Sequence, residues 1–200
     1  MRKKRFHPLI IVISGPSGSG KSTVISNLLS APPLNASAKF SVSATTRPPR
    51  PGETNARDYY FMSRKQFEKL KKQNCFAEWA KVHGEYYGTP RSEIERITKK
   101  RKDVVLELDV QGGNSIKKLY PDAVTIFLSV PQQTLRTRLL NRASSLPPPQ
   151  LKKEIRSRLE TAKKENKAAK NYKYVVKNID LETATEQIHT IIETERNKMT

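Results

Sequence analysis

The sequence predicts an α/β fold of three layers, with a mainly parallel central sheet between layers of helices. Short apolar runs typical of buried strands recur at residues 9–13, 104–108, 123–130 and 174–176, with helix-like stretches between and after them. Alternation of this kind favours a layered sheet covered by helices. A glycine-rich loop that follows the first run also predicts a strand, a tight turn and a helix in succession.

That loop has the sequence GPSGSGKS at residues 15–22, directly behind the apolar run LIIVI. A buried strand, glycines, Lys, Ser and a helix at residues 23–29 form the layout of a phosphate-binding P-loop. Glycines leave the backbone N–H groups free to point at a phosphate, and the helix adds its positive N-terminal end. Lys21 supplies positive charge to the outer phosphates, and Ser22 is a candidate ligand of Mg²⁺. The motif predicts a triphosphate site made by Gly15, Pro16, Ser17, Gly18, Ser19, Gly20, Lys21, Ser22 and Thr23.

Two segments in the first half of the chain interrupt the alternation. Residues 31–38 include Pro32-Pro33, and we expect them to form a surface loop. Residues 43–89 hold short polar and aromatic segments and a turn signal at Pro51-Gly52, with too little regular pattern for another strand–helix–strand unit. We expect them to form an inserted subdomain.

The second half of the chain returns to alternation, with helices expected at residues 111–120, 132–141 and 181–196. Residues 142–150 contain three consecutive prolines and cannot be helical throughout, because each proline restricts the residue before it. We interpret them as a mobile loop over the substrate site or as a linker between helices.

Length and composition limit the class of protein. Two hundred residues fit one domain with its own core. The single cysteine excludes an intramolecular disulfide framework, and together with the lack of any membrane-length apolar segment it favours a cytoplasmic protein with no membrane partner. The basic residues 1–5 precede an apolar run that is too short for a signal peptide.

The charge is strongly positive, with 38 basic and 19 acidic residues and a formal net charge of +19. Polyanions are therefore expected partners, either nucleic acid or bound nucleotides with several phosphates. No nucleic-acid module accompanies the charge, so specific nucleic-acid binding is not expected. Much of the surplus lies on predicted helices, where a solvated basic face is the alternative.

Arg47 and Arg50 flank a Pro-Pro pair in the predicted subdomain. Two guanidinium groups held apart by a stiff segment can bind phosphate oxygens bidentately with little loss of entropy. The hydroxyls of Tyr59 and Tyr87 can donate to the same phosphate. Each of these residues alone is more often a surface arginine or a half-buried tyrosine, so the prediction depends on their combination.

Six motifs occur in one order along the chain: GPSGSGKST (15–23), FSVSATTRPPRPGE (40–53), DYYF (58–61), FAEWAKVHGEYYGT (76–89), VLELDVQG (105–112) and, more loosely, YKYVVKNIDLETA (172–184). In this order they resemble the guanylate kinase family over nearly the full length. The resemblance implies a P-loop kinase fold with an inserted GMP-binding subdomain and a lid. It also implies ATP-dependent phosphorylation of GMP to GDP, and of dGMP, with Mg²⁺. ATP and GMP are then the partners, and the protein is a monomer or a homodimer.

The resemblance also implies a division of the single domain 1–200. The core comprises residues 1–42, 90–141 and 159–200, the acceptor-binding subdomain residues 43–89 and the lid residues 142–158. On this family pattern the acceptor phosphate contacts Arg47, Arg50, Tyr59 and Tyr87, and the guanine contacts Ser43, Glu78, Thr89 and Asp109.

The chemistry of guanine agrees with two carboxylates at this site. Its N1–H and 2-amino groups are donors, which Glu78 and Asp109 can accept, whereas adenine has an acceptor at N1 and no 2-amino group. Adenine would leave charged acceptors unpaired, a mismatch that can discriminate by about 10⁴ to 10⁵. Alternatively, Glu78 is a rim carboxylate paired with Lys81.

Glu107 and Asp109 end the run at 104–108 and point to one face by strand periodicity. The resemblance assigns Glu107, through water, to the metal beside Ser22, and Asp109 to the nucleobase. The sequence does not separate these roles, and Asp109 equally suits a cap of the helix that begins near Gln111.

Cationic side chains are expected around the transferring phosphoryl group. Arg138 and Arg142 share a helix face at i and i+4, and the resemblance adds Arg158. It also makes Asn178 an ATP contact. The chain departs from the family pattern at Arg142-Ala143, in its three lid prolines and at Asn178-Ile179-Asp180.

Three other functions fit parts of the sequence. A related P-loop kinase could phosphorylate a sugar phosphate or another nucleotide. A guanylate-kinase-like module could bind phosphorylated proteins without catalysis, although such modules lack a competent P-loop and Lys21 and Ser22 are both present here. The net charge fits a P-loop ATPase acting on nucleic acid, but no helicase motif accompanies it.

Overall fold

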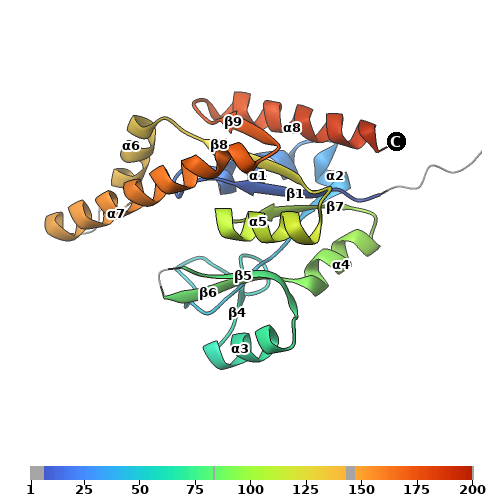
Figure 1. Cartoon of the computed structure of the whole chain (residues 1–200), viewed down its shortest axis with the longest axis horizontal. Helices are drawn as coiled ribbons and strands as arrows, with labels where there is room; N and C mark the ends of the chain where they lie inside the picture. The colour runs from blue at the N-terminus through green and yellow to red at the C-terminus, as the bar shows by residue number, and fades with distance from the viewer. Residues whose placement is uncertain (1–6, 83, 143–146, 200) are drawn as a thin grey trace, which may run out of the picture.

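The centre of the protein is a five-stranded sheet in the order β2-β7-β1-β8-β9, in which every pairing is parallel (Figure 1). The computed structural model describes residues 7–82, 84–142 and 147–199. The sheet confirms the mainly parallel arrangement predicted from the apolar runs. Its strands are β1 (Ile10–Ser14), β2 (Ala38–Phe40), β7 (Asp103–Glu107), β8 (Val124–Ser129) and β9 (Tyr174–Lys177).

Helices cover both faces of this sheet. Because successive residues of a strand point to opposite sides, each strand contributes to two cores. Ile11 and Ile13 of β1 belong to a core cluster with residues of α1 and α8, whereas Val12 belongs to a second cluster with residues of α4 and α5. The three predicted layers are therefore present. The covering helices are α1 (Lys21–Ser30), α8 (Leu181–Lys198), α4 (Arg91–Lys99) and α5 (Val110–Leu119).

A second, four-stranded sheet lies beyond α4 and α5, in the order β4-β3-β6-β5 (Figure 1). The helix α3 packs on it through Phe67, whose ring stacks on Phe76 and Tyr86. Residues 43–89 thus build a separate small sheet, in the part of the chain expected to be inserted. Its elements are β3 (Ala44–Thr45), β4 (Tyr60–Phe61), α3 (Arg64–Lys72), β5 (Phe76–Val82) and β6 (Glu85–Pro90).

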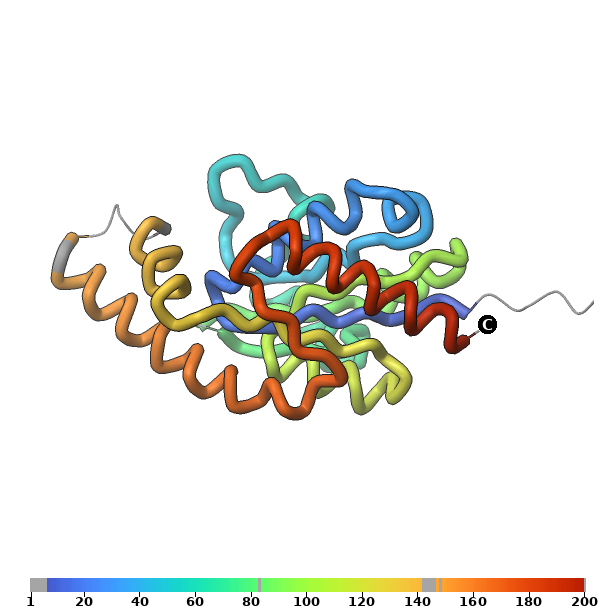
Figure 2. The backbone as a smooth tube through the Cα atoms, turned by 90° about the horizontal axis from the view of Figure 1, so that it is seen from above, coloured from blue at the N-terminus to red at the C-terminus, as the bar shows by residue number. Residues whose placement is uncertain are grey.

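Two helices, α6 (Gln132–Arg142) and α7 (Pro148–Lys167), lie side by side beyond one end of the central sheet (Figures 1 and 2). They pack through a small cluster that includes Leu135, Leu139 and Ile155. The predicted interruption near the prolines agrees with α6 ending at Arg142 and with α7 beginning at Pro148, since proline is favoured in a first helical turn. A short 3-10 helix, Ala168–Asn171, then leads into β9.

The expectation of a surface loop at residues 31–38 is wrong for residues 34–38, whereas residues 31–33 form an exposed turn. Leu34–Ser37 form the short helix α2, and Ala38 begins β2. Leu34 and Ala38 are buried in the cluster under α1 and α8. One buried leucine among small and polar residues produces no periodic pattern, so this packing could not be predicted from the sequence. The basic residues 1–5 and Ala143 lie outside the described residues, and no described helix is long and apolar enough to cross a bilayer.

Candidate active site

In the loop between β1 and α1, Gly15 and Gly20 lie where a side chain would strike a neighbouring group. Gly15 has a φ of +149° and Gly20 a φ of +92°. A Cβ on Gly15 would lie 2.3 Å from the carbonyl oxygen of Leu128, and one on Gly20 would lie 2.5 Å from Nδ2 of Asn178. The first turn of α1 contains no acidic residue. The loop backbone and the helix N-terminus therefore present positive potential, which suits a phosphate.

Lys21, the first residue of α1, folds back over this loop. Its Nζ donates hydrogen bonds to the carbonyl oxygens of Gly15, at 2.7 Å, and of Pro16, at 3.1 Å. The ammonium group is thus held at the start of the loop, where it can contact the outer phosphates of a nucleotide bound to the backbone N–H groups.

Two of the three predicted arginines donate hydrogen bonds to this loop from helices α6 and α7. Arg138 of α6 donates from Nη1 to the carbonyl oxygen of Ser19, at 3.3 Å. Arg158 of α7 donates from Nη1 to Oγ of Ser17, at 3.2 Å. Helices α6 and α7 therefore bring positive charge to the loop from a part of the chain more than a hundred residues away. The side chain of Arg142 lies outside the described part of the structure.

Asn178 follows β9 and supports the loop from within. Its side chain is 1% exposed, and Nδ2 donates to the carbonyl oxygen of Ser19 at 2.7 Å. Among the described residues, Oδ1 of Asn178 has no hydrogen-bond partner. The contact with Ser19 explains why a side chain at Gly20 would clash, whereas the expected contact with ATP stays a prediction.

Ser22 and Glu107 meet where α1 begins and β7 ends. Oγ of Ser22 donates to Oε1 of Glu107 at 3.0 Å. Hydroxyl and carboxylate oxygens suit Mg²⁺, which in nucleotide-binding proteins takes few protein ligands besides phosphates and water. No group of three His, Cys, Asp or Glu residues suited to a metal occurs in the described ranges. The donor set fits a metal ion that arrives with a nucleotide.

The predicted acceptor-phosphate residues gather around Arg47. Its two terminal nitrogens each bond a carboxylate oxygen of Glu53 at 2.6 Å, and its guanidinium lies 5.0 Å from the centre of the Tyr59 ring. The Tyr59 and Tyr87 rings meet edge to face at 6.0 Å. Arg50 is exposed, and its backbone N–H donates to Glu53 at 2.8 Å. Arg47, Arg50 and both tyrosines thus belong to one small region.

Glu53 is a residue of this region that sequence reasoning missed. The hydrogen bonds from Arg47 lower the pKa of Glu53 to about 2, and the same bonds raise the pKa of Arg47 above its usual value. Both groups are therefore charged at every physiological pH. A phosphate that binds Arg47 has to compete with this carboxylate. The only sequence sign was an acidic residue in the turn after Pro51-Gly52, and nothing there indicated its partner.

Glu78 and Asp109 converge on the first turn of α5. A Cβ on Gly112 would lie 2.8 Å from Oε2 of Glu78 and 3.4 Å from Oδ1 of Asp109. Asp109 also accepts from the Gly112 backbone N–H at 2.7 Å, so the predicted alternative of a helix cap is present. Thr89, paired with Glu78 across β5 and β6, donates from Oγ1 to that carboxylate at 2.6 Å. Ser43 is half-buried, one residue before β3.

Burial changes the acidity of Glu78, which is 6% exposed. Burial raises its pKa to about 7, and the charge of Asp109 adds to this, although the hydrogen bond from Thr89 acts in the opposite direction. The alternative pairing with Lys81 is not observed, because Lys81 is exposed and its ammonium lies 5.9 Å from the Tyr86 ring. Glu78 is therefore a buried acceptor with a high pKa and not a rim carboxylate.

Glu165 of α7 is a second residue that sequence reasoning missed. Burial raises its pKa, while the positive charge of Lys21 lowers it and the negative charge of Asp109 raises it. The carboxylate therefore lies within electrostatic range of both the loop and the end of β7. The register of α7 against the loop is set by tertiary packing, so the sequence carried no sign of it.

Comparison with known proteins identifies the arrangement. A family model described as Guanylate kinase matches residues 7–195. The chain belongs to the guanylate kinase family. It is 42% identical to a guanylate kinase of Clostridium tetani, over 94% of this chain and 86% of that protein. It is 40% identical to a guanylate kinase of Rickettsia bellii, over 95% of this chain and 96% of that protein.

Solved structures agree with this assignment to the guanylate kinase family. The crystal structure of guanylate kinase from Anaplasma phagocytophilum superposes with a TM-score of 0.75 at 30% identity, and covers 96% of this chain and 88% of that chain. The structure of TT1252 from Thermus thermophilus has a TM-score of 0.52 at 16% identity over 94% of this chain and 98% of that chain, which indicates a shared fold alone. The predicted guanylate kinase resemblance and fold class are therefore confirmed.

Proposed function

We propose that this chain transfers the γ-phosphoryl group of ATP to GMP, and to dGMP, and forms GDP or dGDP. One observation carries the proposal: the end of β7 joins the two halves of the site. Glu107 accepts a hydrogen bond from Ser22 of the P-loop helix, and Asp109, two residues later, converges with Glu78. A P-loop and a carboxylate pair suited to guanine are thus adjacent, as a kinase with two nucleotide substrates requires.

The acceptor base would bind between the second sheet and α5. Glu78 and Asp109 would accept from N1–H and the 2-amino group of guanine, while the Ser43 hydroxyl would donate to its O6. Thr89 donates its one hydroxyl proton to Glu78 and would donate to guanine only by releasing that bond. Arg47, Arg50, Tyr59 and Tyr87 would hold the phosphate. The position of the Arg47 guanidinium beside the Tyr59 ring, which in turn meets the Tyr87 ring, supports this assignment.

Transfer needs no nucleophilic side chain. A phosphate monoester has its second pKa near 6, so the acceptor oxygen is largely ionised at neutral pH. The chain would contribute position and charge: the loop backbone and Lys21 hold the donor phosphates, and Arg138, Arg142 and Arg158 neutralise charge on the phosphoryl group. The contacts of Lys21, Arg138 and Arg158 with loop atoms support these roles.

Mg²⁺ is the cofactor that the site suits. Ser22 and, through water, Glu107 would hold it. When bound, the ion shields negative charge on the phosphates. Residues 43–89 would act as the acceptor-binding subdomain and residues 142–158 as the start of a lid that excludes water. The proposed boundary at residue 158 falls within α7, which continues as one helix to Lys167.

The proposal is tested by measuring ADP formation in a coupled assay with GMP, dGMP or AMP as acceptor. We expect a preference for GMP over AMP of about 10⁴ in kcat/KM. Glu78→Ala should reduce kcat/KM for GMP at least about tenfold, because it removes a buried acceptor. Glu68→Ala, which changes an exposed carboxylate on α3, is the matched control. Equal turnover of AMP and GMP by the unaltered protein would refute the proposal.

A further inference from the structure

The outer side of the second sheet carries aromatic rings and positive charges that the kinase reaction does not use. We define the Trp79 surface as Trp79, Lys81 and Tyr86 of β5 and β6 with Arg64 and Lys71 of α3. Nζ of Lys71 lies 3.4 Å from the centre of the Trp79 ring, and the Trp79 and Tyr86 rings meet edge to face at 6.1 Å. The guanidinium of Arg64 lies 5.4 Å from the Tyr86 ring.

This surface is separate from the proposed GMP site. Successive residues of a strand point to opposite sides of the sheet. Glu78 points inward and is 6% exposed, whereas the next residue, Trp79, points outward and is 42% exposed. A ligand on the Trp79 surface therefore leaves the carboxylate pair accessible to a nucleotide.

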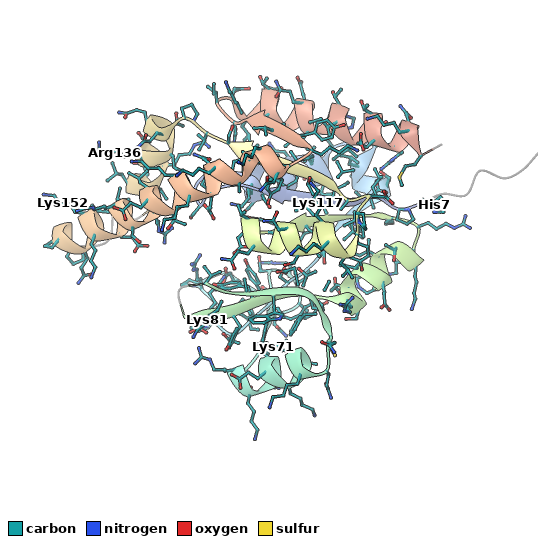
Figure 3. The ribbon with its side chains drawn as sticks, viewed as in Figure 1. His7, Lys71, Lys81, Lys117, Arg136 and Lys152 are labelled. Atoms are coloured by element: carbon teal, nitrogen blue, oxygen red, sulfur yellow. The ribbon has the colours of Figure 1, made fainter. Side chains whose placement is uncertain are left out.

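The positive charge of this surface lacks acidic partners among the residues that the structure describes. Helix α3 holds five basic residues and one acidic residue in the sequence RKQFEKLKK. Among the described residues, neither these cations nor Lys81 form an ion pair, in contrast to Arg156 and Arg158 of α7, which bond acidic residues one turn away. Figure 3 shows Lys71 and Lys81 on this part of the molecule and Lys152 at the far end of α7. No described acidic side chain therefore neutralises this charge, although Nη2 of Arg64 donates to the carbonyl oxygen of Gly84 at 2.6 Å.

We propose that the Trp79 surface binds single-stranded nucleic acid without sequence preference. Proteins that do so combine cations, which contact the phosphates, with aromatic rings on which bases stack. The Trp79 surface holds both within a few ångströms. The arrangement also explains a large exposed indole beside an unneutralised basic helix, a combination that neither the core nor the kinase site requires.

A lipid surface fits these observations less well. Binding at a membrane interface needs apolar side chains that enter the acyl boundary, together with basic residues. The exposed large apolar side chains of the described residues, apart from Trp79, lie elsewhere, at Leu119, Leu140, Val175, Ile179 and Met199. None belongs to α3, β5 or β6.

Trp79 is the only tryptophan of the chain, so its fluorescence reports directly on this surface. We expect oligo(dT) of about 12 nucleotides to quench it in a saturable manner, at ionic strength below 0.1 M. The logarithm of the binding constant should fall with the logarithm of salt concentration with a slope of about −2 to −3, as for three or four phosphate contacts. Saturating GMP should not displace the oligonucleotide.

Variants distinguish binding at the Trp79 surface from general attraction of the oligonucleotide to a basic protein. With labelled oligo(dT) and fluorescence anisotropy, Trp79→Ala should weaken binding by about tenfold, the effect of one lost stacking contact. Lys71→Glu should also weaken it about tenfold or more, whereas Lys163→Glu, the same charge change at an exposed site of α7 outside the proposed lid, should change it less than about twofold. The kinase activity of all three variants should match that of the unaltered protein, which also verifies their folding.

Four results would overturn the inference. They are binding without quenching, displacement of the oligonucleotide by GMP, equal losses from Lys71→Glu and Lys163→Glu, and tighter binding to vesicles of anionic phospholipid, with a blue shift of Trp79, than to oligo(dT). The kinase assay is independent of all four, so a failure of the proposed function would be seen separately.

Discussion

Glu78 links the acidity of a single residue to the choice of substrate. Burial raises its pKa to about 7, and an ionised carboxylate is the form that accepts from guanine. The group is therefore increasingly protonated as pH falls below 7. We predict that KM for GMP rises about tenfold between pH 8 and pH 6, while KM for ATP changes little, as measured in initial-rate pH profiles.

The Glu78→Gln variant provides the control for this pH dependence. Its side chain does not titrate, so only the GMP phosphate, with its pKa near 6, still changes protonation over this range. The profile of the variant should be flatter, and its KM for GMP higher at pH 8. Identical profiles for the two proteins would show that Glu78 is not the titrating group.

Lys21 acts on the donor phosphates, in our proposal, and not on the acceptor. Its Nζ lies on the loop carbonyls of Gly15 and Pro16. Lys21→Ala should lower kcat by about 10² to 10³, the usual cost of removing a group that stabilises transition-state charge. The Kd for GMP, measured by calorimetry, should change less than about threefold. Equal losses in kcat and in GMP affinity would contradict the assigned role.

Among the elements, α4 and β4 are joined by one buried carboxylate. Glu93, in the first turn of α4, is 4% exposed and accepts from Oη of Tyr60 at 2.7 Å and from Nη2 of Arg96 at 2.9 Å. Burial alone would raise its pKa, but the hydrogen bonds from Arg96 and Tyr60 lower it. Glu93 therefore holds the second sheet against the helix that follows it.

Loss of the hydrogen bond from Tyr60 to Glu93 should weaken the binding of GMP more than the binding of ATP. Tyr60→Phe deletes one hydrogen bond to a buried charge, so we predict a loss of about 1 to 2 kcal/mol in the free energy of unfolding. It should also raise KM for GMP severalfold and leave KM for ATP unchanged. Tyr120→Phe is the control, since Tyr120 makes no side-chain hydrogen bond among those described. A Tyr60→Phe variant with unaltered stability would refute the role of this link.

The sequence was informative where an element is long and uniformly buried. Strands β1, β7 and β8 are largely apolar because helices cover both faces of the sheet, and the P-loop is a local motif. In contrast, β3 and β4 have two residues each, and α2 buries only Leu34, so neither periodicity nor length distinguishes them. Glu53 and Glu165 became visible only from their partners, Arg47 and Lys21, which folding brings to them.

Across the whole molecule, the C-terminal helix is tied to the sheet by a buried carboxylate in a chain of net charge +19. Glu195 of α8 accepts from Tyr174 of β9 at 2.7 Å and from Lys198 at 2.5 Å, and it also pairs with Lys173. Burial alone would raise its pKa, but these hydrogen bonds lower it to about 2. Protonation of Glu195 therefore weakens its bonds with Tyr174, Lys198 and Lys173, and it increases the net positive charge of the folded protein.

The lowered pKa of Glu195 determines how the stability of the protein changes as pH falls. A carboxyl group whose pKa is lowered from 4.5 to about 2 by folding stabilises the protein fully above pH 4.5 and progressively less as pH falls toward 2. Glu195→Gln should reduce the free energy of unfolding by about 2 kcal/mol at pH 7, measured by urea denaturation. The difference from the unaltered protein should shrink between pH 4.5 and 2, because the unaltered protein then loses the same charge. Glu186→Gln, an exposed site on the same helix, should have no such effect, and a difference independent of pH would show that Glu195 contributes by packing and not by charge.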